Sequence, residues 1–258
     1  VCEHSTLDQY RASTQDRFGD DYKVHMSGLD KEKSHPVGGT ACIIRSRKRM
    51  IIRPKPALQS TAPLLDEGRM GLYAVQMGVA THVLVYILYG WQGADHDPEA
   101  ASRSDALVAQ AIEDAARMPH GPILIVGDLN ASVHTLPTLA QGVVEGQWID
   151  VGALEQFSGE NGGTCMPTCF VKGADPTRRD YIFANPRAME MITNFKVDLH
   201  SGLPTHAMLH LELSTRTDEV LRPTLALPHP AKGLMLQALQ RAYPADRYIS
   251  KEPIADGK

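Results

Sequence analysis

The chain has 258 residues, enough for one large α/β domain or two small ones, and a hydrophobic fraction of 43%, near the ordinary value for a globular protein. Disorder throughout is therefore excluded. With 26 lysines and arginines against 30 aspartates and glutamates the net charge is −4, so any contact with nucleic acid or an anionic membrane must be local.

The amino-terminal half is expected to be rich in strands. Residues 1–35 are polar and predict an edge of the fold, with a helical or loop-like segment and then a short strand at 22–26. From Pro36, short apolar runs punctuated by glycine are typical of successive strands, some joined by hairpin turns. We expect these strands at 38–44, 50–52, 71–77 and 81–89. The most apolar run is about a third as long as a membrane helix, so no membrane contact is expected.

The second half alternates one long helix with further strands. Apolar residues at three- and four-residue spacings predict an amphipathic helix over 98–118, which Pro119 ends. Residues 122–128 are a continuous apolar run, typical of a strand buried on both faces. Later elements are expected at 180–184, 186–192, 195–199 and 207–213, the second of them a short helix.

The composition changes after Leu213, where the chain becomes polar and proline-rich. We therefore expect a layered α/β domain over 1–213 and a linker or tail over 214–258, with a short helix at 233–243. Because the chain opens on Val1 rather than methionine, we expect a fragment of a longer protein, and its compartment stays open.

The strongest local signal is Gly127-Asp128-Leu129-Asn130, directly after the buried strand. Glycine, aspartate and asparagine are all turn residues, so one interpretation is a simple strand-to-turn connection. The other is a site, because strand ends in layered sheets hold catalytic groups in fixed positions.

Two further segments favour the site. Asp180 opens one predicted strand and His206 directly precedes another. A carboxylate can orient an imidazole, fix its tautomer and favour its protonated form, and a charged imidazolium suits a phosphate substrate. We predict that Asp180 and His206 lie within hydrogen-bond reach, in the same cleft as Asp128.

The three segments Gly127-Asp-Leu-Asn130, Arg179-Asp-Tyr-Ile182 and Pro204-Thr-His206 resemble, in order and separation, the endonuclease/exonuclease/phosphatase family. That family includes pancreatic-type deoxyribonucleases, abasic-site endonucleases, phosphatases, sphingomyelinases and the endonuclease domains of non-LTR retrotransposons. The resemblance implies a four-layer α/β sandwich of two facing, mainly antiparallel sheets with helices outside. Its first strand would lie upstream of residue 1.

The resemblance also implies which residues bind the metal and the phosphate. Val1-Cys-Glu3 resembles the end of the family's second strand, which makes Glu3 a ligand for Mg²⁺ or Mn²⁺. Val85-Tyr-Ile-Leu-Tyr89 resembles the strand that delivers a phosphate-contacting tyrosine, which makes Tyr89 a phosphate-site hydroxyl. Thr205 stands where the family usually has an aspartate, which predicts weaker metal affinity. Gly90-Trp91-Gln92 replaces the usual Pro-Asn after the tyrosine.

On the hydrolytic side, the resemblance makes Asp128 the carboxylate that orients or deprotonates the attacking water. Asn130 would hold Asp128 and a phosphate oxygen, and Asp180 would orient His206 against the scissile phosphate. Which of Asp128 and His206 is the general base stays open. A phosphodiester needs a Lewis acid, an oriented water and donors to its oxygens, and these residue types supply them.

One segment of the sequence is strongly basic. It has six cations and no acid within eleven residues: Arg45, Arg47, Lys48, Arg49, Arg53 and Lys55. Such charge can protect an edge strand from aggregation. Because the rest of the chain is acidic, we favour a hairpin that contacts the phosphate backbone of nucleic acid. Trp91 and Trp148 could stack on bases, although packing is the commoner role of tryptophan.

The four cysteines are too few for a disulfide scaffold and indicate a reducing compartment. Cys165 and Cys169 are the only pair close in sequence. With no second pair and no histidine at zinc-site spacing, we interpret them as free thiols in a loop or strand.

These patterns together favour a Mg²⁺-dependent phosphodiesterase, most like a DNA endonuclease of retroelement type from a polyprotein with a reverse transcriptase after the tail. A phosphatase or lipid phosphodiesterase on the same scaffold is one alternative. A degenerate member that at most binds nucleic acid is another.

Overall fold

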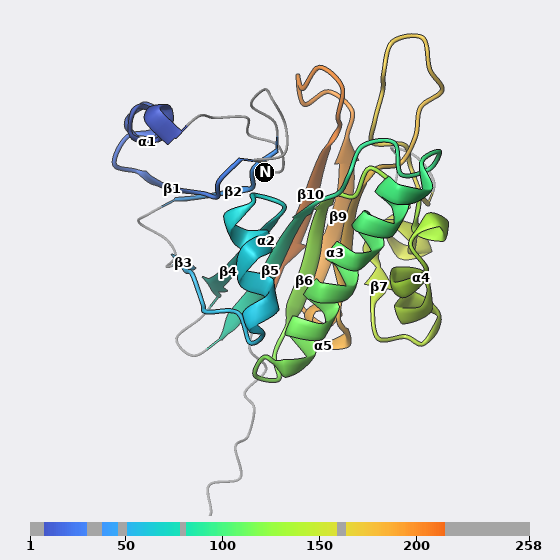
Figure 1. The fold of residues 1–258 in the computed structure, drawn as a ribbon, viewed down its shortest axis with the longest axis horizontal. Coiled ribbons are helices and arrows are strands. Elements are labelled where there is room, and N and C mark those ends of the chain that lie inside the picture. The colour runs from blue at the N-terminus through green and yellow to red at the C-terminus, as the bar shows by residue number, and fades with distance from the viewer. Residues whose placement is uncertain (1–7, 30–37, 46–50, 78–80, 159–163, 215–258) are drawn as a thin grey trace, which may run out of the picture. The chain divides into compact units, whose positions relative to one another are not determined.

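The computed structural model describes residues 8–29, 38–45, 51–77, 81–158 and 164–214 (Figure 1). Its centre is a six-stranded sheet with the order β3-β4-β5-β6-β8-β7, and two further sheets pair β1 with β2 and β9 with β10. The strands are β1 (Tyr22–Met26), β2 (Ala41–Arg45), β3 (Ile51–Ile52), β4 (Met70–Gln76), β5 (His82–Tyr89), β6 (Ile123–Asp128), β7 (Ile149–Asp150), β8 (Asp180–Ala184), β9 (Ile192–Asp198) and β10 (Met208–Leu213). The α-helices are α1 (Arg11–Phe18), α2 (Ala62–Asp66), α3 (Pro98–Arg117), α4 (Pro137–Val144) and α5 (Pro186–Met189).

The predicted strands and the long helix are present, with ends that differ by up to three residues. The sequence did not predict α2, α4 or β7, which are short and carry little periodicity. In α4, for example, Gly142 weakens the helical pattern, but a Cβ at that position would lie 3.0 Å from the Trp148 ring. The glycine therefore allows the helix to pack closely on the tryptophan.

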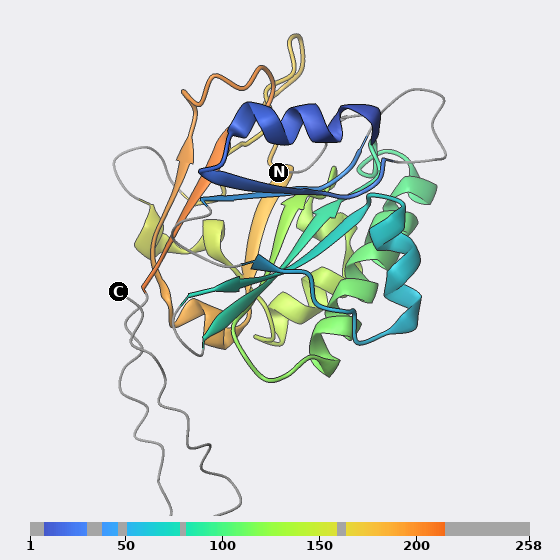
Figure 2. The same ribbon diagram turned by 90° about the vertical axis from the view of Figure 1, so that its left-hand side faces the viewer.

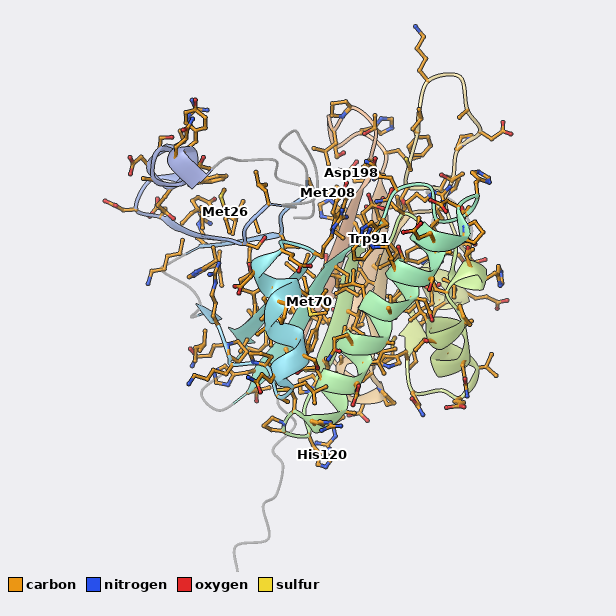
Figure 3. The ribbon with its side chains drawn as sticks, in the orientation of Figure 1. Met26, Met70, Trp91, His120, Asp198 and Met208 are labelled. Atoms are coloured by element: carbon orange, nitrogen blue, oxygen red, sulfur yellow. The ribbon has the colours of Figure 1, made fainter. Side chains whose placement is uncertain are left out.

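The central sheet is mostly antiparallel, but β5 and β6 run parallel. A parallel pair needs a long crossover connection, and α3 supplies it. Asp97 caps this helix by accepting a hydrogen bond from the backbone N–H of Glu99, and Pro98 occupies its first turn. Figure 3 shows His120, which follows the crossover helix, beyond the lower end of α3, whereas Trp91 lies beside the helix.

The helix-facing side of the sheet forms one hydrophobic core. Leu107, Val108 and Ala111 of α3 are buried with Tyr86 of β5 and Ile125 of β6. Asp114, also on α3, has no exposed surface, and its carboxylate accepts hydrogen bonds from the hydroxyls of Tyr86 and Thr61 and from the backbone of Leu58. The buried charge is thus satisfied by three donors.

The opposite side of the sheet packs on β9 and β10. Phe195 and Val197 of β9 share a second hydrophobic core with Val83, Leu124 and Ile182 of the central sheet. Figure 2 shows the central sheet between α3 on one side and the β9–β10 pair on the other. The predicted class, an α/β fold of facing sheets with helices outside, is confirmed.

The prediction that the basic segment is a hairpin is wrong. β2 pairs with β1, whereas β3 pairs with β4 in the central sheet, so residues 45–55 connect two sheets. Strands adjacent in sequence commonly pair, but here the two strands belong to different sheets. Arg53 donates a hydrogen bond to the carbonyl oxygen of Met26 and lies over the Tyr73 ring, which ties the two sheets together.

Some predictions concern residues outside those that the structure describes. They include Glu3, Arg47, Lys48 and Arg49, and the tail beyond Ser214. Within the described part of the chain, none of the helices has the length and apolar character of a membrane span.

Candidate active site

Strand register places Asp128 between two other predicted site residues. It ends β6, opposite Tyr89 of the parallel strand β5 and opposite Asp180 of the antiparallel strand β8. The preceding residue, Gly127, has a φ of 147°, and a Cβ there would lie 1.9 Å from the carbonyl oxygen of Leu88. Only glycine therefore permits β5 and β6 to approach so closely beside the site.

Asn130 holds the Asp128 carboxylate from two sides. Its backbone N–H donates to Oδ1 of Asp128 at 2.9 Å, and its side-chain amide donates to Oδ2 at 3.2 Å. The same amide is 3.3 Å from the carbonyl oxygen of Gly90. Asn130 has a φ of 52°, a left-handed conformation that asparagine tolerates better than most residues. The turn residues at 127–130 thus position a carboxylate that is only 6% exposed.

The expected contact between Asp180 and His206 is present. Nδ1 of His206 lies 2.8 Å from Oδ2 of Asp180, and because an ionised carboxylate can only accept, Nδ1 is the donor. The other ring nitrogen, Nε2, is then turned toward Oδ2 of Asp128, 4.0 Å away. The contact fixes the orientation of the ring, with Nε2 on the side of Asp128.

Asp128, Asp180 and His206 together offer three ligand atoms within 4.8 Å of one another. Carboxylate oxygens suit Mg²⁺ and Mn²⁺, so this donor set fits the cation that the sequence predicts.

Tyr89 is buried, with 1% of its surface exposed. The guanidinium of Arg69 lies over its ring, 4.9 Å from the centroid, and its hydroxyl accepts a weak hydrogen bond of 3.4 Å from the Gln92 amide. The structure brings Tyr89 to Asp128 through the strand register, and its role as a phosphate-site hydroxyl stays a prediction.

Sequence reasoning missed Thr168, which joins the two strand ends of the site. The side-chain oxygen of this buried residue accepts hydrogen bonds from the backbone N–H groups of Arg179 and Asp180, at 3.0 and 2.9 Å. Its carbonyl oxygen accepts from the N–H of Ala207, next to His206. A lone threonine in a loop carries no sequence signal for such a position.

A second missed residue is Asp95, which forms an ion pair with Arg179 next to Asp180. Burial opposes ionisation of Asp95, but donors outweigh it and lower its pKa: the backbone of Ser132, the hydroxyl of Thr135 and the guanidinium of Arg179. Asp95 thus links the loop after β5, the loop after β6 and the start of β8.

The third missed residue is Cys169, whose Sγ lies 3.8 Å from Nε2 of His206. Neither Cys165 nor Cys169 forms a disulfide, in agreement with the predicted free thiols. Burial, together with the charges of Asp128 and Asp180, raises the pKa of the Cys169 thiol.

The two tryptophans take packing positions. Trp148 is 5% exposed in the helix-side core, so the suggested stacking on bases does not apply to it. Trp91 is partly buried, and the guanidinium groups of Arg69 and Arg103 each lie 4.5 Å from the centre of its ring.

None of the protein-family models matches this sequence, and no curated protein matches it either. The structure nevertheless resembles solved structures. A 3'-5' exonuclease, NExo, from Neisseria meningitidis has a TM-score of 0.59 at 19% identity, covering 83% of this chain and 87% of that one. The AP endonuclease LMAP from Leishmania major has a TM-score of 0.60 at 14% identity, covering 82% and 77%. The endonuclease domain of TRAS1, a telomere-specific non-LTR retrotransposon, has a TM-score of 0.53 at 13% identity, covering 76% and 79%.

At these identities the likeness concerns the fold. The chain has the fold of the endonuclease/exonuclease/phosphatase proteins, as the three sequence segments predicted.

Proposed function

We propose that this chain is a divalent-metal-dependent phosphodiesterase that cleaves DNA, an endonuclease of retroelement type. The observation that carries the proposal is the alignment of Asp180, His206 and Asp128, with contacts of 2.8 and 4.0 Å. A buried charge is costly unless it is paired. A protein without a catalytic role therefore has no need of two carboxylates turned toward one imidazole.

Each residue has a chemical task in this proposal. Asp180 holds His206 in the orientation that presents Nε2 to a phosphate oxygen or to the attacking water. Asp128, fixed by Asn130, orients that water and accepts its proton. A divalent cation, when bound by the carboxylates, neutralises charge on the transferring phosphoryl group.

DNA is the favoured substrate class because of what related folds bind. NExo, a 3' phosphatase, is known in complex with a product DNA hairpin, and TDP2 from D. rerio in complex with a single-strand DNA product. The endonuclease domain of TRAS1 supports the retroelement type. Mg²⁺ is the proposed cofactor, and Glu3 the proposed further ligand.

The decisive experiment is a nicking assay on supercoiled DNA with Mg²⁺ or Mn²⁺. We expect Asp128→Asn to lower cleavage by about 10²–10⁴-fold, because water activation is lost while the side-chain shape is kept. Glu113→Gln, a charge change on the exposed face of α3, is the matched control and should cleave like the wild type. Unfolding curves of both variants verify that they fold.

Three outcomes contradict the proposal in different ways. Cleavage by Asp128→Asn equal to that of the wild type contradicts the role assigned to Asp128. Hydrolysis of inositol phosphates or sphingomyelin without nicking of DNA favours the phosphatase or lipid phosphodiesterase alternative. No hydrolysis by a folded chain favours the degenerate, non-catalytic alternative.

The basic segment is proposed to bind DNA phosphates even though it is not a hairpin. Replacing Arg47, Lys48 and Arg49 by glutamine should weaken DNA binding and flatten its salt dependence by about 0.9 log unit of slope per lost contact. Hydrolysis of a small phosphodiester should barely change, since the segment positions only a long polyanion. An unchanged salt slope would contradict this role.

A further inference from the structure

Arg69 carries a buried charge next to the end of β5. It directly precedes β4, and only 3% of its surface is exposed. Its carbonyl oxygen accepts a hydrogen bond from the backbone N–H of Tyr89. Its side chain continues past that contact, so that Nη1 donates to the carbonyl oxygen of Gly90 at 3.0 Å and lies 3.4 Å from that of Tyr89. Because burying a charged group is costly, an apolar side chain would fill this space at lower cost.

Gly90 is the residue through which Arg69 meets the turn after Asp128. The N–H of Gly90 donates to the carbonyl oxygen of Asp128 at 2.8 Å. A Cβ at position 90 would lie 2.1 Å from the carbonyl oxygen of Leu129. Glycine therefore allows the segment after β5 to lie directly against the turn after β6. A shift of the Gly90 backbone would displace that turn.

The carbonyl oxygen of Gly90 is shared by two donors. Besides Nη1 of Arg69, it accepts from the side-chain amide of Asn130 at 3.3 Å. The same amide nitrogen donates to Oδ2 of Asp128 at 3.2 Å. An amide nitrogen carries two hydrogens in a fixed plane, so the acceptor of one sets the direction of the other. These contacts connect the guanidinium, through Gly90 and Asn130, to the Asp128 carboxylate.

Two aromatic rings hold the Arg69 guanidinium in place. It lies 4.9 Å from the centre of the Tyr89 ring and 4.5 Å from the centre of the Trp91 ring. Guanidinium is planar and weakly hydrated, so it stacks on such rings while its N–H groups still donate. The backbone N–H of Trp91 donates to the hydroxyl of Ser104 on α3, which fixes this segment to the helix. The position of the guanidinium is therefore determined from several sides.

We propose that Arg69 is a positioning residue for Asp128: it fixes the Gly90 carbonyl, and through it the amide of Asn130 that orients the carboxylate. This role rests on the proposed function, in which Asp128 orients water and accepts its proton. Because the side chain of Arg69 is buried, it acts on the carboxylate rather than on the substrate. Its removal should lower kcat and leave KM nearly unchanged.

A double-mutant cycle with Asn130 distinguishes this role from a purely structural one. Arg69→Met keeps an unbranched apolar stem and removes the hydrogen bond to Gly90, and it should lower kcat for DNA cleavage by about 10- to 100-fold. Asn130→Gly removes the amide, and glycine accepts the φ of 52° at this position. In that background Arg69→Met should change kcat by less than about twofold, because the group through which Arg69 acts is already absent. Equal losses in the two backgrounds, or a raised KM with an unchanged kcat, overturn the proposal.

Arg103→Met is the matched control. The guanidinium of Arg103 comes from α3 and lies over the same Trp91 ring, also 4.5 Å from its centre. Its replacement removes an equivalent stacking contact and leaves the contact between Arg69 and Gly90 in place. kcat should stay within about twofold of the wild-type value. A loss as large as that of Arg69→Met would assign the effect to stacking and overturn the role of the hydrogen bond. Circular dichroism at the assay temperature verifies that each variant is folded.

A measurement without catalysis tests the same contacts. In ¹H–¹⁵N spectra the side-chain amide of Asn130 is identified by its loss in Asn130→Gly. Its signals should shift in Arg69→Met and stay in place in Arg103→Met. Unchanged Asn130 signals in Arg69→Met overturn the inference. Where Arg69→Met fails to fold, Asn130→Gly alone decides: the side-chain N–H signals of Arg69 should shift in it, because the two donors share one acceptor, and unchanged signals overturn the inference.

The two proposals can fail separately. Shifted Asn130 signals in a chain that cleaves no DNA support the contacts of Arg69 and contradict the phosphodiesterase. DNA cleavage in which Arg69→Met costs the same with and without the Asn130 amide does the reverse.

Discussion

The hydroxyl of Thr168 is the acceptor that fixes the start of β8, and Thr168→Val removes it while keeping the side-chain shape. The residue is 1% exposed, and its hydroxyl accepts from the backbone N–H groups of Arg179 and Asp180. Valine would leave both amides without this acceptor, directly beside the carboxylate that orients His206.

The cost follows from those two hydrogen bonds. An amide left without its acceptor costs up to about 1–3 kcal/mol, and both of these amides are partly buried, so together they predict a loss of up to about 2–6 kcal/mol in the free energy of unfolding. Thr168→Ser keeps the acceptor and loses one buried methyl group, which costs about 1 kcal/mol. The serine variant is therefore the matched control.

Urea denaturation measures both free energies of unfolding. We expect the valine variant to be less stable than the serine variant by more than about 1 kcal/mol. Cleavage should fall more in the valine variant as well, because Asp180 loses the anchor of its own backbone. Equal stability of the two variants would show that the hydroxyl contributes nothing, and the reasoning from its two hydrogen bonds would be refuted.

Two other predictions concern the residues around the site. Asp95→Asn should lower the free energy of unfolding by about 1–3 kcal/mol at neutral pH. Since hydrogen bonds and Arg179 lower the pKa of Asp95, the stability difference from the wild type should be complete above pH 3.8, the ordinary pKa, and should vanish as the pH falls through the lowered pKa. Denaturation curves recorded over a pH series measure this difference. A gap that persists in strong acid would contradict the role of the charge. Gly127→Ala should lower the free energy of unfolding by about 3 kcal/mol or more, because its Cβ would clash with the Leu88 carbonyl. Gly121→Ala is the control: its Cβ would have no neighbour closer than 3.7 Å, so the loss in the same assay should be under about 1 kcal/mol. Similar losses of stability in the two variants would contradict the clash.

Local patterns carried the successful part of the sequence analysis. The buried strand before Asp128 and the amphipathic helix α3 are continuous in sequence, so their periodicity or apolar run is visible without a structure. The pairing of Asp180 with His206 followed from placing each at a strand end. The hairpin failed because sequence shows that two strands are adjacent, but not which strand each will pair with.

The contacts that sequence could not reveal join distant segments. Asp95 reaches Arg179 across 84 residues, and Cys169 reaches His206 across 37. The antiparallel bridge between Cys169 and His206 brings the pair together. An isolated bridge has no periodic sequence pattern, so it cannot be predicted from the sequence.

The site can be understood as a consequence of strand register. Tyr89, Asp128 and Asp180 end or begin neighbouring strands and lie in one row across the sheet, because β5 pairs in parallel and β8 antiparallel with β6. A shift of one residue in either pairing would turn a side chain to the opposite face. The cores on both faces prevent that shift, since Tyr86 and Ile125 are buried under α3 while Leu124 and Ile182 are buried under β9. The hydrophobic pattern of three strands therefore determines which polar groups meet, and the chemistry of the site depends on residues that never touch a substrate.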